Sequence, residues 1–205
     1  MKKKKVIWSF FVIALIGIIA GYFIIRNLTT TTKYGKLSII KAVTLKIDSY
    51  FDPSSMSGKS VIQMRNLLNK GTMKLNAKSI PFLNIKNMNI VIASNKVPVR
   101  IYTPESGDKF PVIIYSHGGS WISGNLDTHD NVCRKLSKKT KAIVVSVDYR
   151  LAPENPFPAG LNDVYDVLQW VFKNSQSIHG DSKHICVVGD SAGGNLSAAV
   201  CPNDT

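Results

Sequence analysis

Hydrophobic residues follow three different patterns along the chain. An uncharged run from Val6 to Ile25 comes directly after four lysines. From Asn27 to about Lys86 the chain is polar and lysine-rich, and within it the stretch from Ser60 to Lys70 carries apolar residues at helical spacing. Beyond Lys86, short apolar runs alternate with amphipathic segments, which is typical of strands and helices packed in layers.

The first apolar run is long enough to span a bilayer. Its twenty residues, at about 1.5 Å of helical rise each, match the roughly 30 Å of hydrocarbon in a membrane. A cleaved signal peptide would have a shorter apolar region followed by small residues, whereas Ala20-Gly21 is followed by Tyr22-Phe23-Ile24-Ile25. We therefore favour an uncleaved single-pass anchor, Val6 to Ile25, with a cleaved signal peptide as the alternative. The cluster Lys2 to Lys5 favours a cytoplasmic N-terminus, so the remaining chain is expected on the extracytoplasmic side.

The pattern after residue 86 predicts an α/β fold. NMNIVIAS and VPVRIYTP are β-rich and are separated by Asn95-Lys96, which predicts a hairpin. Three continuous apolar runs predict strands buried on both faces of a parallel sheet, namely Pro111 to Ser116, Ala142 to Val147 and His184 to Gly189. Helices are expected over Asp127 to Thr140 and from about Ala159 to Lys173. The expected organisation is a lysine cluster and anchor over 1–26, a stalk and N-terminal cap over 27–85, and an α/β domain over 86–205.

Charge and cysteine content exclude several functions. The formal net charge is +13, but residues 1–100 carry 17 Lys/Arg against Asp48 and Asp52, while residues 101–205 carry 9 against 11 acidic residues. The basic half has no cluster of Lys/Arg interleaved with aromatic residues, so nucleic acid is not an expected partner. Cys133, Cys186 and Cys201 lack CxxC spacing, and no disulfide framework, metal or cofactor is expected.

The stretch VVGDSAGGN carries the most specific chemistry. Gly189 to Gly193 fits G-x-S-x-G, with an apolar strand before it and a small-residue helix after it. A serine on such a strand-to-helix turn has a strained backbone, and flanking glycines let neighbouring chain pass closely. Ser191 is thus a candidate nucleophile, and the supporting residues of the motif are Gly189, Asp190, Gly193 and Gly194.

A second motif lies 74 residues upstream of the serine. SHGGSW, Ser116 to Trp121, follows a predicted buried strand, and its glycines expose backbone N–H groups at the sheet edge where Ser191 is expected. Together with the N–H of Ala192, two such donors would hold the oxyanion of an acyl-transfer intermediate.

With these motifs in this order, the chain from about Lys86 to Val200 resembles the hormone-sensitive-lipase-like family of α/β-hydrolases. The resemblance implies a three-layer fold with a mostly parallel central sheet. It also implies that Ser191 accepts the acyl group, that His117 organises its loop without acting as the base, and that residues before Lys86 help to shape the acyl pocket. The implied oxyanion hole comprises Gly118, Gly119 and Ala192. Ser120, which replaces the third glycine of the family motif, is a further candidate donor.

The chain departs from the family after the serine. The triad order in this fold is Ser, then Asp or Glu, then His, but the sequence ends fourteen residues after Ser191. His184 is expected about 20 Å away, at the opposite end of the sheet, and His179 lies before it. His129 is on the correct side of the sheet, with nothing expected to orient it. The sequence therefore resembles an incomplete hydrolase domain, truncated after the elbow, whose last strand is an apolar sheet edge.

We expect a membrane-anchored carboxylic ester hydrolase that uses an acyl-serine mechanism and favours short acyl or acetyl esters, with this chain alone inactive. One alternative is a non-catalytic, membrane-anchored binding protein built on half of a hydrolase fold. Another is an amide hydrolase on the same scaffold. The pattern does not predict the oligomeric state.

Overall fold

The computed structural model describes residues 17, 21–22, 31–32, 35–36, 58–75, 78–82, 84–92 and 95–201. The chain divides into two compact units, residues 1–58 and 59–205. In the first unit, β1 (Thr31–Thr32) pairs antiparallel with β2 (Gly35–Lys36). Apart from Gly17, Gly21 and Tyr22, the predicted anchor lies outside the described residues. Among the residues that are described, no helix has both the length and the apolar character needed to cross a membrane.

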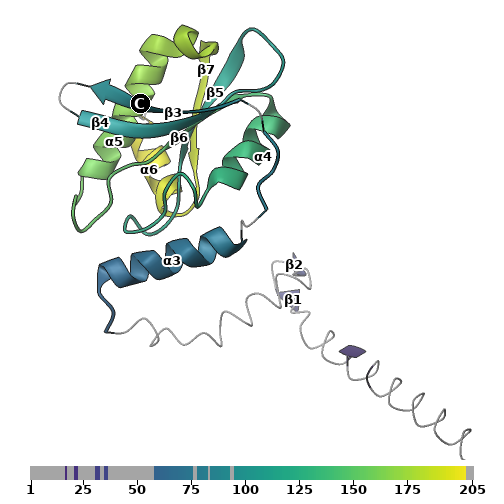
Figure 1. The fold of residues 1–205 in the computed structure, drawn as a ribbon, viewed down its shortest axis with the longest axis vertical. Coiled ribbons are helices and arrows are strands. Elements are labelled where there is room, and N and C mark those ends of the chain that lie inside the picture. The colour runs from purple at the N-terminus through teal and green to yellow at the C-terminus, as the bar shows by residue number, and fades with distance from the viewer. Residues whose placement is uncertain are drawn as a thin grey trace, which may run out of the picture. The chain divides into compact units, whose positions relative to one another are not determined.

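The second unit contains a five-stranded sheet with the order β3-β4-β6-β5-β7 (Figure 1). The strands are β3 (Ile85–Ile92), β4 (Asn95–Tyr102), β5 (Phe110–Ser116), β6 (Ile143–Val147) and β7 (Gly180–Gly189). The helices are α3 (Val61–Leu75), α4 (Asp130–Thr140), α5 (Ala159–Asn174), the 3-10 helix η2 (Ser175–Ile178) and α6 (Ala192–Val200). The elements expected from the apolar runs and from the helical periodicity are thus confirmed, and β7 begins four residues earlier than predicted.

The sheet is mixed. β3 and β4 form the expected antiparallel hairpin, but Ile92 pairs with Asn95, so Asn95 and Lys96 belong to β4 and not to the connection. β4 also pairs antiparallel with β6, whereas β5 pairs in parallel with both β6 and β7. A short connection such as that between β3 and β4 can join only antiparallel neighbours. The β3–β4 hairpin therefore forms an antiparallel part of the sheet. The expectation of a mostly parallel sheet is therefore wrong for the described strands.

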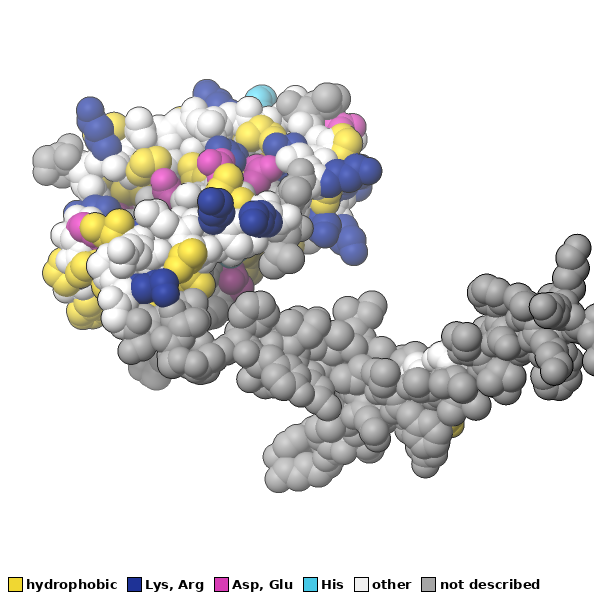
Figure 2. All heavy atoms as spheres, turned by 60° about the horizontal axis from the view of Figure 1, so that its bottom comes forward, with side chains coloured by type: hydrophobic (Ala, Val, Ile, Leu, Met, Phe, Trp, Pro, Cys, Tyr) yellow, Lys and Arg dark blue, Asp and Glu magenta, His cyan; other side chains and the backbone are white. Residues whose placement is uncertain are grey.

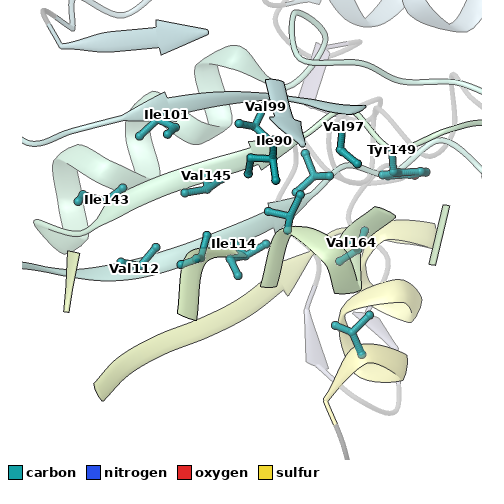
Figure 3. Close-up of a cluster of buried hydrophobic side chains, with 14 of the residues drawn as sticks. Ile90, Val97, Val99, Ile101, Val112, Ile114, Ile143, Val145, Tyr149 and Val164 are labelled. Atoms are coloured by element: carbon teal, nitrogen blue, oxygen red, sulfur yellow. The ribbon is translucent and has the colours of Figure 1, made fainter. Parts of the chain in front are cut away.

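Side chains of the sheet alternate between two apolar layers, which accounts for the three-layer architecture. Val112 and Ile114 face α5 and α6, in the cluster that Figure 3 shows, together with Val164 of α5. Ile113 and Tyr115 face the other way and pack with Cys133 of α4. Successive residues of a strand point to opposite faces, so β5 and β6, covered on both sides, read as continuous apolar runs.

β7 lies at an edge of the sheet. Its residues are mostly half-buried or exposed, and Cys186 in its middle is exposed. The prediction that this run is buried on both faces is therefore wrong, because β5 is its only neighbouring strand in the described part of the chain. The prediction of a sheet edge at this strand is confirmed. Of the other two cysteines, Cys133 is buried and Cys201 is exposed.

On one face of the second unit, basic side chains lie among acidic and apolar ones (Figure 2). Arg100, for example, contacts both Asp127, at 2.9 Å, and Asp130, at 3.2 Å.

Candidate active site

Ser191 lies on a sharp turn between β7 and α6. It is the N-cap of α6 with φ 50° and ψ −120°, and its side chain makes no capping hydrogen bond to that helix. A positive φ is strained for a residue other than glycine, so the expected backbone strain at the serine is observed. The residue is exposed, and its position at a helix N-terminus favours negative charge developing beside it.

Two glycines of the motif allow the turn to lie tightly against β5. A Cβ at Gly193 would overlap the carbonyl oxygens of Ser116 and His117. A Cβ at Gly189 would overlap the backbone of Gly193 and approach the Ser116 carbonyl. Any larger residue at either position would push the turn away from the sheet edge, which gives a physical reason for both glycines.

The SHGGSW loop leaves the sheet at the same edge as the serine turn. Ser116, the last residue of β5, pairs in parallel with Gly189, the last residue of β7. Beyond it, Ser120 and Trp121 both have positive φ, 54° and 59°, and the N–H groups of Ile122 and Ser123 donate to the Gly119 carbonyl. Serine at the third motif position thus adopts the strained conformation and retains its backbone N–H.

The backbone N–H groups near Ser191 differ in availability. The N–H of Gly118 donates to Oδ1 of Asp190 at 3.0 Å, so it is not free to bind an oxyanion, contrary to expectation. Within the described chain, no hydrogen bond uses the N–H of Gly119, Ser120 or Ala192. These three are the donors that the geometry leaves available.

Asp190 joins the serine turn to the SHGGSW loop. Its Oδ1 also accepts a hydrogen bond from the Tyr115 hydroxyl at 2.6 Å, and its Oδ2 lies 3.5 Å from Nε2 of His129. Burial acts to raise the pKa of Asp190, but the bonds from His129, Tyr115 and Gly118 outweigh it and hold the pKa below its usual range. Asp190 is therefore a carboxylate at neutral pH.

His117 is buried beneath the loop. Its ring stacks on Tyr149 with centroids 4.3 Å apart, its Nδ1 contacts the Gly118 carbonyl at 2.9 Å, and the Tyr149 hydroxyl donates to the His117 carbonyl at 2.7 Å. Burial lowers the pKa of His117 to about 4. A neutral, enclosed imidazole fits the organising role that the resemblance implies.

His129 is held in place, contrary to the expectation that nothing orients it. Its Nδ1 lies 2.9 Å from the Thr128 hydroxyl, and its Nε2 faces Asp190. His129 and Ser191 line the same cavity, but both ring nitrogens of His129 already have partners. His184 is exposed in the first half of β7 and pairs with Asp181, far along the strand from Ser191, as expected.

Helix α3 covers this cavity, which has a volume of about 270 Å³ and is lined by Leu68, Asn69 and Thr72 together with the serine turn and the SHGGSW loop. The Asn69 side chain accepts a hydrogen bond from the N–H of Gly124 at 2.8 Å. Arg65 donates to the carbonyls of Ile122 and Ala152 and forms a two-pronged ion pair with Glu154. The sequence pattern indicates the helix, but it does not indicate these contacts.

Within the described residues, no group of three or more His, Cys, Asp or Glu side chains is arranged to hold a metal ion.

The site combines a strained serine between a strand and a helix with a nearby loop that has unused backbone N–H groups. On a three-layer α/β scaffold, this arrangement is similar to the nucleophile elbow of α/β-hydrolases. Residues 113–203 match the model of the α/β-hydrolase fold family. The resemblance drawn from the sequence is thereby confirmed.

Relatives and solved structures similar to this chain are named as esterases. The chain is 53% identical over 105 residues to the carboxylesterase NlhH of Mycobacterium tuberculosis, covering 51% of this chain and 33% of that protein. It is 37% identical over 129 residues to an arylesterase of Saccharolobus solfataricus, covering 62% and 42%. Among solved structures, the hyperthermophilic esterase of Pyrobaculum calidifontis superposes with a TM-score of 0.71 at 34% identity, covering 80% of this chain and 52% of that one. The chain thus spans between a third and about half of the length of these relatives.

Proposed function

We propose that the protein is a carboxylic ester hydrolase in which Ser191 attacks the ester carbonyl. The observation that carries the proposal is the exposed, strained serine beside the unused N–H groups of Gly119, Ser120 and Ala192. These donors would stabilise the oxyanion of the tetrahedral intermediate. The named esterases that share this segment support the same reaction class.

The proposed reaction passes through an acyl-enzyme. Ser191 Oγ forms a bond to the carbonyl carbon, the alcohol leaves with a proton, and water then releases the acid and restores the serine. A serine needs a general base, because its hydroxyl stays protonated at neutral pH. Both nitrogens of His129 have partners, so we do not assign that base within the described residues, and we expect low turnover by this chain alone.

We further propose short acyl or acetyl esters as substrates. One relative, 36% identical over 104 residues, is an ethyl acetate hydrolase of Pseudomonas putida, which supports this choice. The membrane anchor at Val6 to Ile25, with the hydrolase domain on the extracytoplasmic side, is likewise a proposal that rests on the uncharged run and the lysines before it.

A graft tests the reaction class. Residues 86–201 of this chain would replace the matching segment of the mycobacterial carboxylesterase, so that the relative supplies the rest of its fold. We expect hydrolysis of p-nitrophenyl acetate that falls by about four orders of magnitude in Ser191→Ala and is retained in His129→Ala. A folded graft that is inert would contradict the proposal. Cleavage of p-nitroacetanilide in preference to the ester would favour the amide alternative.

A further inference from the structure

Helix α3 has two faces of different character. Its inner face carries Val61, Arg65, Asn69 and Thr72, which recur at helical spacing and are half-buried. Arg65 and Asn69 hold the helix to the loops around the serine site through hydrogen bonds. Figure 1 shows α3 outside the layers formed by the sheet and its covering helices. Because the helix is attached through its inner face, the opposite face is presented to solvent.

The outer face of α3 consists mainly of six exposed residues, namely Ile62, Asn66, Leu67, Lys70, Met73 and Lys74. Its three apolar side chains are largely exposed, Ile62 at 58%, Leu67 at 50% and Met73 at 48%. Leu67 and Lys70 also line one open hollow on the helix. Large apolar side chains that gather on one exposed surface often mark a site of interaction.

The charge of the outer face is positive. Residues 53–104 contain eight Lys/Arg and no Asp or Glu. Lys70 and Lys74 form no ion pair with any residue that the structure describes. The groove that borders this face contains Asp127 and Asp130, but both carboxylates pair with arginines. The outer face therefore favours a partner that carries negative charge.

A lipid bilayer with anionic headgroups matches both the charge and the apolar side chains. Lysines bind at the headgroups while their stems lie along apolar surface, and aliphatic side chains enter the boundary of the acyl region. An acidic polypeptide or a nucleic acid would pair with the lysines, but it would leave Ile62, Leu67 and Met73 against polar groups. The mixture of residues thus favours the bilayer over these other partners.

We propose that the outer face of α3 docks on the surface of an anionic lipid bilayer. The bonds of Arg65 and Asn69 lie on the inner face, so docking leaves the attachment of α3 to the loops intact. Each lysine close to such a surface strengthens binding about fivefold, so Lys70 and Lys74 together contribute about 25-fold. The inference goes beyond the proposed reaction and depends neither on ester hydrolysis nor on the proposed anchor.

A fluorophore on the outer face tests the proposal in the full-length chain. Asn66→Cys is labelled with nitrobenzoxadiazole in a background of Cys186→Ser and Cys201→Ser, while Cys133 is buried and stays unlabelled. The chain is reconstituted with vesicles of phosphatidylcholine that contain increasing fractions of phosphatidylglycerol. We expect the emission to shift to the blue as the phosphatidylglycerol fraction rises. Salt at about 0.5 M should reverse the shift, because it screens surface charge.

Paired neutral substitutions separate docking by α3 from binding through other basic segments. Lys70→Gln with Lys74→Gln should lower the equilibrium constant for docking about 25-fold. Lys135→Gln with Lys139→Gln is the matched control, because these exposed lysines have the same spacing on α4, and it should leave the shift unchanged. The run Val6 to Ile25 is present in every sample, so it does not account for a difference between variants. Thermal melts verify that both variants are folded.

Four results in this assay would overturn the inference: no blue shift with phosphatidylglycerol, an equal shift in pure phosphatidylcholine, an equal effect of the two glutamine pairs, or a shift without lipid that rises with protein concentration. The last would mean that a second copy of the chain covers the outer face. A larger shift with poly-glutamate than with vesicles would also overturn it and would assign the face to an acidic polypeptide. Because the assay involves no ester, an inactive esterase graft would leave it unaffected.

Discussion

Asp190 offers a direct test of how the serine turn is coupled to the SHGGSW loop. Both bonds from Tyr115 and Gly118 go to the same oxygen, Oδ1, so Asp190→Asn can keep them while losing the charge. Hydrogen bonds to a charged acceptor contribute about 1 kcal/mol more than neutral ones. Two such bonds would together contribute about 2 kcal/mol, but the Asp190 side chain is 51% exposed, and solvent screening reduces that contribution by about half. We therefore expect Asp190→Asn to lower the free energy of unfolding by about 1 kcal/mol.

Asp190→Ala removes the acceptor as well. The N–H of Gly118 and the hydroxyl of Tyr115 then lose their partner, and water can replace it only in part. Each unsatisfied polar group costs about 1–3 kcal/mol. Because the site is open to water, the lower end of that range applies to each of the two groups, and we expect the free energy of unfolding to fall by about 2–3 kcal/mol. Urea titrations of the full-length chain in mild detergent, followed by circular dichroism, measure both variants. Asp108→Asn, at an exposed carboxylate, is the control and should be neutral.

The stabilisation of the fold by the Asp190 charge should depend on pH. Because the pKa of Asp190 is held below its usual value, its charge stabilises the fold above the unfolded pKa of about 3.9 and this stabilisation is lost as the pH falls through the folded pKa. The difference between wild type and Asp190→Asn should therefore shrink as the pH falls from about 5 to 2. Other carboxylates, such as Asp181, contribute equally to the pH dependence of both proteins, so their contributions cancel in this difference. A difference that stays constant over that range, or an Asp190→Asn variant as stable as wild type at pH 7, would refute the reasoning.

Three further substitutions test the scaffold around the site. Asp163→Ala leaves the N–H of Arg150 without its buried acceptor, and urea unfolding should show a loss of about 3 kcal/mol; a loss below 1 kcal/mol would contradict this. Ser120→Gly relieves the positive φ and should raise Tm by about 2 °C in a thermal melt, whereas a lower Tm would argue against strain there. Gly193→Ala forces a Cβ into the backbone of β5 and should abolish the cooperative melt; a native-like melt would show that the turn can relax.

The sequence predicts the local elements of this fold well. β5 and β6 are covered by helices on both faces, so their residues form continuous apolar runs that can be recognised without knowing their partners. The face of α5 that packs on the sheet is equally visible, because Val164, Val167 and Val171 recur at helical spacing and are buried as expected.

Contacts between distant segments could not be predicted in the same way. Nothing in the local pattern shows that β7 pairs with β5 and not with β6. The bond from Gly118 to Asp190 spans 72 residues, and the pair of Arg65 with Glu154 spans 89. Such contacts depend on where whole elements come to lie. The choice of oxyanion donors and the individual contacts of α3 could therefore be seen only in the three-dimensional arrangement, although the resemblance implied that the residues before Lys86 help to shape the pocket.

The position of β7 at the edge of the sheet limits how long the serine keeps its geometry. In the described sheet, β7 has a neighbour on one side only, β5, and its last residue leads directly into the strained turn at Ser191. Each time this single ladder opens locally, the turn is free to relax to an unstrained backbone. Amide hydrogen exchange along β7 measures how often this pair of strands opens.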